Sequence, residues 1–385
     1  MFNVHYVQVD NELAQLKEAI LLAKSLDEDV FLFTKDAGKL PQYSFDEISN
    51  LIIDLVTNNI TMLFLDVESA YTVRFNKYLE YIEDITTVNS FFITKPLYPL
   101  VLALIDYKED YHCDSLLKLI QLVDPYNYKL SNSNNFHIIQ QKINVVSPFR
   151  NAAAYLPEYL DSIHKQHYSN YKINLIDDNS EIPYDISDRM NNKVNLIVNK
   201  ERKYALQNIL DTLVCSNYND DDIICFVDAD DVLLHNHVFE ILNAIYSTNS
   251  NINLTYGSMI YLDRNSLHKV GSKYSKDEFA SLRLSPWKAA HLRTFKYKLF
   301  KKLLSNDPEL HCLRDDDGEI FKMPYDMAFL FPLMELAGYD GIAFLNTPLY
   351  GYRMHENNDH ILYRKIQYES EMKIRNKKTL ITINY

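Results

Sequence analysis

Glycine is scarce in this sequence, at 7 of 385 residues. The glycines are scattered, so neither G-x-G-x-x-G nor G-x-x-x-x-G-K occurs. Both motifs wrap backbone N–H groups around the phosphates of a nucleotide at the N-terminus of a helix. A protein that binds a phosphate-bearing ligand without such a loop must neutralise the phosphates with a metal ion or with side chains.

Cysteines and long apolar runs are also few. The cysteines form no C-x-x-C pair, which excludes a zinc ribbon and a disulfide framework and is typical of a reducing compartment; they are Cys113, Cys215, Cys225 and Cys312. The longest apolar stretch, residues 96–105, contains two prolines and is too short to span a bilayer. We therefore expect a soluble cytoplasmic protein, located in the host cytoplasm or the virion if the source is a virus.

Positive charge is in deficit over the whole chain. Lys and Arg number 39 against 52 Asp and Glu, which gives a formal net charge of −13. An extended nucleic-acid surface needs a basic excess, so we expect no nucleic-acid partner. A content of 47% hydrophobic and 24% charged residues is ordinary for globular domains, and the length predicts two or three of them.

The C-terminal segment, residues 361–385, reverses that balance, because its basic residues outnumber its two glutamates. It predicts a basic amphipathic helix followed by an apolar end. One interpretation is a solvated helix that covers the preceding domain. The other is peripheral contact with an anionic partner, namely a membrane lipid headgroup, a diphosphate or an acidic glycan.

Alternating apolar strands and amphipathic helices predict two α/β domains, the first over residues 1–124. In this first domain we expect a mostly parallel sheet and no chemical motif. Its expected elements are strands at 4–9, 30–34, 62–66 and 91–94 and helices at 12–24, 45–57, 73–83 and 97–107. Residues 125–140 are rich in Asn, Ser and Tyr and predict a linker. Residues 141–360 resume the alternation, with acidic residues at strand ends, as in doubly wound sheets.

The strongest local signal is Asp228-Ala229-Asp230-Asp231, which follows the apolar strand ICFV. Three carboxylates at one strand end repel one another unless a cation compensates them. Carboxylate oxygens suit Mn²⁺ or Mg²⁺, and such an ion would bridge the phosphates of a nucleotide diphosphate. The alternative is an acidic turn that caps the helix expected from residue 237, a role that fits Asp231.

A second acidic pair, Asp177-Asp178, follows the strand INLI. These carboxylates are suited to accept hydrogen bonds from a nucleobase N–H and a ribose hydroxyl. The alternative is an Asx turn at the end of the strand.

Further downstream, Asp326 precedes the helix expected at 327–336, where a carboxylate is a good N-cap that the helix dipole stabilises. His355 would add one imidazole to a metal site. His235 and His237 form an H-x-H pair, but no third soft ligand is near them in the sequence. We therefore interpret these two histidines as residues at the start of a helix.

Together these segments resemble the GT-A glycosyltransferases of family 2, and in particular a subgroup found in bacterial and viral glycan-building proteins. The resemblance covers residues 141–360. It rests on VVSPFRNAAAYLPEYLDSIHKQHYSNYKINLIDDNS, on the D-x-D motif at 228–230, on HLRTF at 291–295 and on DMAFLFPLMELAG at 326–338. It implies a nucleotide-diphospho-sugar transferase domain with a mixed, mostly parallel sheet and flanking helices. It does not extend to residues 1–138, where the alternation of strands and helices predicts a smaller α/β domain.

Carried over residue by residue, the resemblance implies a donor site in the first half of this domain. Pro148 and Asn151 would shape the loop under the nucleotide, and Arg150 would reach a phosphate or the base. Asp178, with Asp177 as the alternative, would contact the base. The other residues implied for the nucleotide-sugar are Arg202, Lys203, Asp228 and Ala229, with Asp228 on the ribose.

The resemblance also implies the metal ligands. Asp230, with Asp228 and His355, would hold Mn²⁺ or Mg²⁺. The alternative to His355 is the segment Asn357, Asn358 and Asp359.

For the chemistry, the resemblance implies that Asp326 is the catalytic base. The acidic residue that the family usually has before the base is here Tyr325. Trp287, His291 and Arg293 lie on the expected acceptor side.

The implied activity is an inverting, metal-dependent transfer of a sugar from a nucleotide diphosphate, a UDP-sugar by family default. The acceptor would be a hydroxyl of a glycan, a lipid-linked molecule or a protein. Two alternatives are a catalytically inactive GT-A scaffold and a metal-dependent phosphohydrolase. A nucleotidyltransferase would need a glycine-rich loop after its first strand, and SPFRNAAAY has none. The sequence leaves open the sugar, the linkage and a homo-oligomer.

Overall fold

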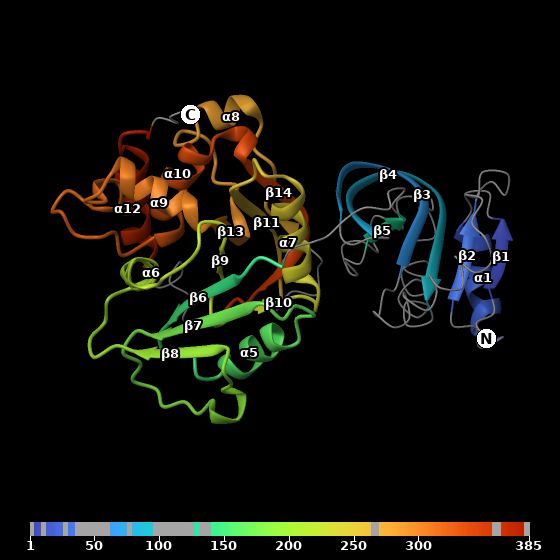
Figure 1. Ribbon diagram of the computed structural model, residues 1–385, viewed down its shortest axis with the longest axis horizontal. Coiled ribbons are helices and arrows are strands. Elements are labelled where there is room, and N and C mark those ends of the chain that lie inside the picture. The colour runs from blue at the N-terminus through green and yellow to red at the C-terminus, as the bar shows by residue number, and fades with distance from the viewer. Residues whose placement is uncertain are drawn as a thin grey trace. The chain divides into compact units, whose positions relative to one another are not determined.

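The structure is a computed structural model, and it divides the chain into two compact units, Met1–Ile138 and Ile139–Tyr385 (Figure 1). The residues it describes are 4–8, 13–25, 30–34, 62–74, 79–94, 127–130, 140–262, 269–355 and 363–380. Each unit is described by itself below.

The first unit contains a five-stranded sheet in the order β1-β2-β4-β3-β5. Its elements are β1 (Val4–Gln8), α1 (Leu13–Ser25), β2 (Val30–Thr34), β3 (Met62–Arg74), β4 (Leu79–Thr94) and β5 (Asn127–Leu130). The pairs β1–β2 and β3–β5 are parallel, whereas β2–β4, β3–β4 and β4–β5 are antiparallel. The sheet is therefore mixed, and the expectation of a mostly parallel one is wrong.

The helix predicted at 73–83 is also wrong, because β3 and β4 form a long antiparallel pair across that segment. The sequence of β4, LEYIEDITTVNSFFIT, is rich in β-branched and aromatic residues, which favour a pleated strand over a helix. The helices predicted at 45–57 and 97–107 lie outside the described residues. Residues 127–130, within the segment predicted as a linker, form β5.

The second unit is built on a nine-stranded mixed sheet in the order β10-β14-β11-β13-β9-β6-β7-β8, with β12 beside β11. Four strands form its parallel half: β6 (Ile143–Phe149), β7 (Tyr171–Asp177), β8 (Val194–Val198) and β9 (Ile223–Phe226). The other half contains β10 (Val232–Leu233), β11 (Leu254–Tyr261), β12 (Lys269–Val270), β13 (Ala290–Lys296) and β14 (Ile342–Tyr352). The predicted mixed α/β fold of this domain is confirmed.

Helices cover both faces of this sheet. They are α5 (Leu156–His164), α6 (Ala205–Cys215), α7 (Val238–Thr248), α8 (Lys276–Ala280), α9 (Tyr297–Asn306), α10 (Tyr325–Ala337) and α12 (Arg364–Arg375). Side chains alternate between the two faces along a strand. Thr255 points to one face, where it forms a hydrogen bond with Thr294 of the neighbouring strand, and Thr294 also bonds Tyr246 of α7. Tyr256 and Phe295 point to the other face and share a core with α6, α9 and α10 (Figure 1).

Helix α10 is the most enclosed of the described helices, because ten consecutive residues, 327–336, are buried. A helix that is apolar all round belongs in a core. Its one buried charge, Glu335, pairs with Arg283 (Nε–Oε1 2.5 Å), and Arg283 also donates to the carbonyl oxygen of Ile374 at 2.7 Å. That contact fastens the end of α12 onto α10.

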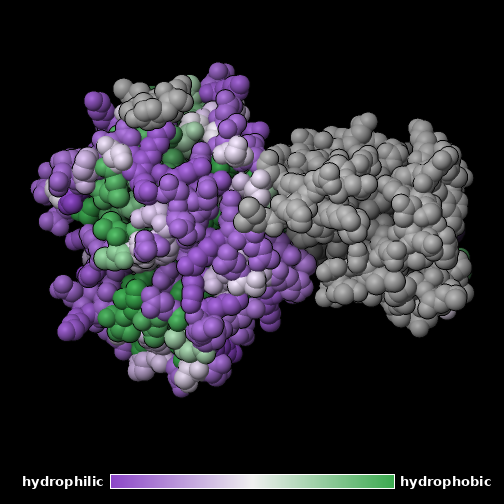
Figure 2. All heavy atoms as spheres, in the orientation of Figure 1, coloured by the Kyte–Doolittle hydropathy of each residue, from purple (hydrophilic) through white to green (hydrophobic). Residues whose placement is uncertain are grey.

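The basic C-terminal segment therefore forms a helix that covers the second unit. Arg375 donates to the carbonyl oxygens of Arg283 and Ser285, and Lys373 lies 3.2 Å from Asp316. This matches the first interpretation of the segment, and an anionic contact through it stays a prediction. Figure 2 shows a largely hydrophilic face on the second unit. None of the described helices combines the length and the apolar character needed to cross a membrane.

Candidate functional site

The carboxyl ends of β6, β7 and β9 meet at one edge of the sheet, because these strands are parallel neighbours. The acidic turn 228–231 leaves β9 at this edge and is bound to β14. The Tyr350 hydroxyl accepts from the Asp228 N–H at 3.0 Å and donates to Asp231 Oδ2 at 2.7 Å. The Arg353 N–H donates to Asp231 Oδ1 at 2.7 Å. Asp231 does not cap α7, whose N-cap is His237.

Burial and mutual repulsion raise the proton affinity of this turn. Burial, followed by Asp230, raises the pKa of Asp228 to about 6. Burial, followed by Asp230 and Asp228, raises the pKa of Asp231 to about 9. Removing carboxylates from water and placing them side by side disfavours the anion, and a bound cation reverses that effect.

His355 lies at the same turn, although 125 residues separate it from Asp230 in the sequence. Its Nε2 is 2.9 Å from Asp230 Oδ2, and its ring stacks on Tyr155 at 4.9 Å between centroids. Arg353 donates to the carbonyl oxygen of Asp230 at 2.9 Å and lies over the same Tyr155 ring. The structure thus brings together Asp230 and His355, two of the three residues expected to ligate the metal. The alternative ligands at 357–359 lie outside the described residues.

Helix α10 brings Asp326 to this edge. Arg293 Nη2 donates to Asp326 Oδ2 at 2.8 Å, and the Met327 N–H donates to Oδ1 at 2.8 Å. The Asp326 side chain is 21% exposed, so a ligand can reach it. The helix begins at Tyr325 with Pro324 as its N-cap, so the expectation that Asp326 is the N-cap is wrong. Asp326 lies in the first turn, where the helix dipole still favours a carboxylate.

Arg293 is buried beside these acids. Burial alone would lower its pKa, but Asp326, Tyr325 and Asp228 more than offset this, so the pKa is raised and the guanidinium stays charged. The Tyr325 hydroxyl donates to Asp228 Oδ1 at 2.6 Å. Burial and then Asp228 raise the pKa of Tyr325 well above its ordinary value, which keeps this donor protonated. Tyr325 thus links the start of α10 to the acidic turn.

His291 and Trp287, both expected on the acceptor side, differ in position. His291 stacks on Tyr350 at 4.5 Å, and its Nε2 is 3.8 Å from Asp228 Oδ2. Burial lowers the pKa of His291 well below its ordinary value, so the imidazole is neutral. Trp287 packs edge-on against Phe331 of α10, with ring centroids 5.1 Å apart, which is the packing role of a core aromatic.

The acidic pair after β7 is enclosed by protein donors. Asp178 accepts from the N–H groups of Lys203 (2.7 Å) and Tyr204 (2.9 Å) and from Asn199 Nδ2 (3.1 Å). Asp177 accepts from the Ser180 N–H at 2.8 Å and from the Tyr184 hydroxyl at 3.0 Å. Asp177 accepts from the N–H three residues on, whereas an Asx turn would use the N–H two residues on, and Asp178 organises the loop that precedes α6.

The remaining predicted donor-site residues line the same edge. Asn151 has a positive φ of 57° and accepts from the Glu181 and Ile182 N–H groups, while Arg150 pairs with Glu181 at 2.6 Å. Pro148 lies in β6, opposite Ile176 of β7.

Arg202 lies over the ring of Tyr204 at 4.2 Å, and Lys203 Nζ is 2.8 Å from Asp211. Ala229 is 2% exposed. Within the described part of the chain, Nε of Arg150 and Nε of Arg202 are buried without a hydrogen-bond acceptor.

Four residues of the site were not predicted to act there: Tyr325, Tyr350, Asp231 and Arg353. Tyr325 stood out only as a departure from the family pattern. Tyr350 carries no local signal, because its role depends on the pairing of β14 with β10 and β11. The H-x-H pair is absent from this edge.

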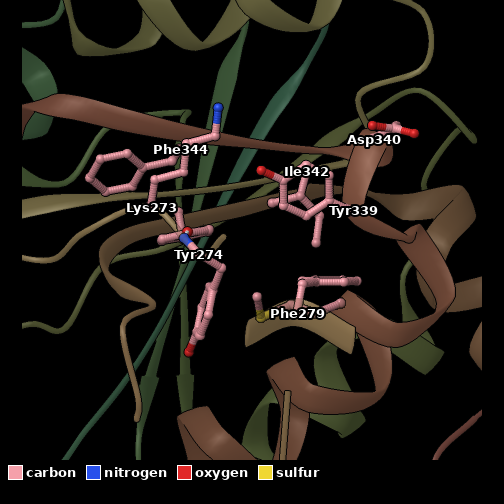
Figure 3. Close-up of a pocket in the computed structure, with 9 residues that line it drawn as sticks. Lys273, Tyr274, Phe279, Tyr339, Asp340, Ile342 and Phe344 are labelled. Carbon is pink, nitrogen blue, oxygen red and sulfur yellow. Dashed lines mark hydrogen bonds between the residues drawn. The ribbon is translucent and has the colours of Figure 1, made fainter. Parts of the chain in front are cut away.

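A separate pocket lies beside the far end of α10 (Figure 3). Aromatic side chains dominate its lining, including Tyr256, Tyr274, Phe279, Tyr339 and Phe344, and Lys273 and Asp340 add one charge of each sign. Met334, which also lines it, is about 12 Å further along the helix axis than Asp326. The sequence did not single out this pocket.

The family model described as glycosyl transferase family 2 matches residues 144–305. These residues contain β6 to β9, the acidic turn, His291 and Arg293, and stop before Asp326 and His355. No curated protein sequence matches the chain significantly.

Distantly similar solved structures include S. aureus TarS 1-349 in complex with UDP-GlcNAc (14% identity, 58% of this chain and 61% of that chain, TM-score 0.42). Another is mannosyltransferase PcManGT from Pyrobaculum calidifontis with GDP-Man and Mn²⁺ (16%, 63% and 66%, TM-score 0.40). A third is glucosyl-3-phosphoglycerate synthase from Mycobacterium tuberculosis with Mn²⁺ and UDP (17%, 61% and 80%, TM-score 0.39). This chain spans 39% of the chain in a further TarS structure.

Proposed function

We propose that this protein is a glycosyltransferase that moves a sugar from a nucleotide diphosphate to an acceptor hydroxyl, since the glycosyl transferase family 2 model matches residues 144–305. The donor is a UDP-sugar, and the acceptor is a glycan, a lipid-linked molecule or a protein. The observation that carries this proposal is the convergence of Asp228, Asp230 and His355 with the Arg293–Asp326 pair at one sheet edge.

The ligand set at the acidic turn fits a divalent metal. The 2.9 Å between Asp230 Oδ2 and His355 Nε2 is the spacing of adjacent ligands around an octahedral ion, about 3 Å for bonds of 2.0–2.1 Å. Burial and then Asp230 raise the pKa of Asp228, and a cation bound at the turn would favour its anionic form. Asp230, His355 and Asp228 would hold Mn²⁺ or Mg²⁺. When bound, such an ion neutralises the departing diphosphate.

Asp326 acts as the general base in this proposal. Arg293 and the Met327 N–H each occupy one lone pair of its two oxygens, which fixes the carboxylate and leaves lone pairs free. The acceptor oxygen attacks the anomeric carbon, its proton passes to Asp326, and the bond from that carbon to the diphosphate oxygen breaks. One displacement inverts the anomeric configuration.

Two tyrosines hold Asp228 in the orientation needed for the ribose and the metal. Tyr325 donates to Oδ1, and Tyr350 accepts from the backbone N–H. Neither hydroxyl can ionise near neutral pH, because burial raises the pKa of both well above its ordinary value. Tyr325 thereby takes a position where the family usually has an acid.

Two arginines offer hydrogen-bond donors to the nucleotide in this proposal. Nε of Arg150 and Nε of Arg202 are buried donors without an acceptor in the described part of the chain. A buried donor without an acceptor is costly, so a ligand oxygen placed there is bound favourably. Asp178 keeps one of four lone-pair sites after its three internal hydrogen bonds, enough for one base N–H.

The experiment is a thermal-shift panel of nucleotide diphosphates and nucleotide-sugars, each with Mn²⁺ and with a chelator. A ligand that binds only the folded state raises the melting temperature. We expect a rise with uridine nucleotides that needs Mn²⁺ and disappears in Asp230→Ala. If well-folded protein shows no rise with any nucleotide, the chain is a scaffold rather than an enzyme of this type. Release of inorganic phosphate without sugar transfer would identify a phosphohydrolase.

A further inference from the structure

The H-x-H pair, His235 and His237, takes no part in the acidic turn. The structure brings a third histidine to it: His167, which follows α5, lies edge-on to His237 with ring centroids 4.5 Å apart. Glu240, in the first turn of α7, contacts His237 Nδ1. One potential ligand atom from each of His167, His237 and Glu240 lies within 4.8 Å of the others.

Hydrogen bonds hold the backbone around these three residues in place. The Gln166 side chain donates to the carbonyl oxygen of His235 at 2.6 Å and accepts from the Phe239 N–H at 3.2 Å. The His167 N–H donates to the carbonyl oxygen of Asn236 at 2.7 Å. The segment after α5 is thus joined to the start of α7. Little further ordering would be needed for the three side chains to coordinate one ion.

Two imidazoles and one carboxylate form a ligand set typical of Zn²⁺, which prefers nitrogen more than Mn²⁺ or Mg²⁺ does. His237 is 3% exposed and Glu240 is partly buried, whereas His167 is exposed. The cluster is therefore enclosed on the protein side and open to solvent at His167. That leaves an entry path and a fourth coordination position for water.

We propose that His167, His237 and Glu240 form a second metal site, for one Zn²⁺-class ion, separate from the acidic turn. Helix α5 starts beside Tyr155, which stacks on His355, and ends at His164, about 13 Å away along its axis. The bound ion joins the segment after α5 to α7 across about seventy residues of chain. Its effect is on the stability of the domain, because metal binding to a folded site adds to folding stability.

The test uses the full chain carrying Asp230→Ala, which removes a ligand of the acidic turn, and measures bound zinc by equilibrium dialysis. We expect one equivalent of zinc, and a melting temperature about 5–10 °C higher at a hundredfold excess over the dissociation constant. His167→Ala in the same background should bind none and show no rise. This variant removes an exposed side chain, so the fold is kept.

The matched control is His311→Ala in that background, because His311 is 76% exposed and pairs with Asp307 outside the cluster. It should bind zinc as Asp230→Ala does. The unsubstituted chain and His167→Ala alone should likewise differ by one equivalent. Absence of zinc from Asp230→Ala, or its retention when His167 is also replaced, would overturn the proposal.

Discussion

Two parallel strands of the second unit, β7 and β9, are each followed by aspartates that are adjacent or nearly so. The two groups of aspartates differ in their surroundings. After β7, Asp177 and Asp178 receive five hydrogen bonds from nearby N–H and O–H groups. After β9, Asp228 and Asp231 have raised pKa values, with burial as the main cause and Asp230 as the next. Similar groups of acidic residues thus organise a loop after β7 and form a turn after β9 whose anionic state a bound cation would favour.

The largest effect should come from removing Asp230, the proposed metal ligand after β9. Asp230→Ala should lower transfer by more than about 10³-fold, because a metal supplies several kcal/mol of charge stabilisation. Steady-state transfer with Mn²⁺ measures this, with Asp220→Ala as the control, a surface acid paired with Lys301. A rate within tenfold of the unsubstituted enzyme would contradict the metal assignment.

Asp326→Asn tests a carboxylate that lies beside the β9 end without being a metal ligand. Transfer should fall about a hundred- to a thousandfold, as expected when a general base is removed. Mn²⁺-dependent nucleotide binding should be unchanged, since the Asn side chain can still accept from Arg293. Binding measured by calorimetry decides between roles: if donor affinity falls with the rate, Asp326 is structural.

At the β7 end the main loss should be in stability. Asp178→Ala leaves the part-buried N–H groups of Lys203 and Tyr204 without their acceptor, which should lower the free energy of unfolding by about 2–4 kcal/mol. Urea unfolding measures this. Asp188→Ala, at an acid that pairs with Arg189 on the surface, is the control. An unchanged unfolding midpoint would show that the loop does not depend on Asp178.

The last effect is one of pH, at the β9 end. The folded-state pKa of Asp228, about 6, lies above its ordinary 3.8, so between about pH 4 and 6 only the unfolded chain releases this proton. Stability contributed by this group is present at low pH and is lost as the pH rises through that window. In chelator, the stability of Asp228→Asn relative to the unsubstituted protein should therefore grow from pH 4 to 6 and then stay constant. A difference independent of pH would mean that Asp228 is not perturbed.

Much of the second unit could be predicted from the sequence because its signals are local. The alternation of strands and helices predicted over residues 141–360 is present, because apolar runs indicate strands and a helical period indicates the buried face of a helix such as α5. In the first unit the same reasoning mistook part of the β3–β4 pair for a helix, because short apolar runs fit both patterns.

For the site, the sequence indicated carboxylates and His355 but not what holds them. Tyr350 and Arg353 act through the pairing of β14, and His167 meets His237 through the contact of two loops seventy residues apart. Such encounters depend on tertiary packing, and no window of sequence contains both partners. For the same reason, the sequence around the H-x-H pair could not indicate His167 as a third potential metal ligand.

Burial of α10 has a consequence for how the protein loses activity on heating. The ten residues that follow Asp326 in this helix are all buried, so the body of α10 cannot open while the rest of the unit stays folded. The amide protons of residues 329–336 should exchange with solvent only through unfolding of the whole unit. Heat inactivation should then coincide with cooperative melting, without an earlier phase of folded but inactive enzyme.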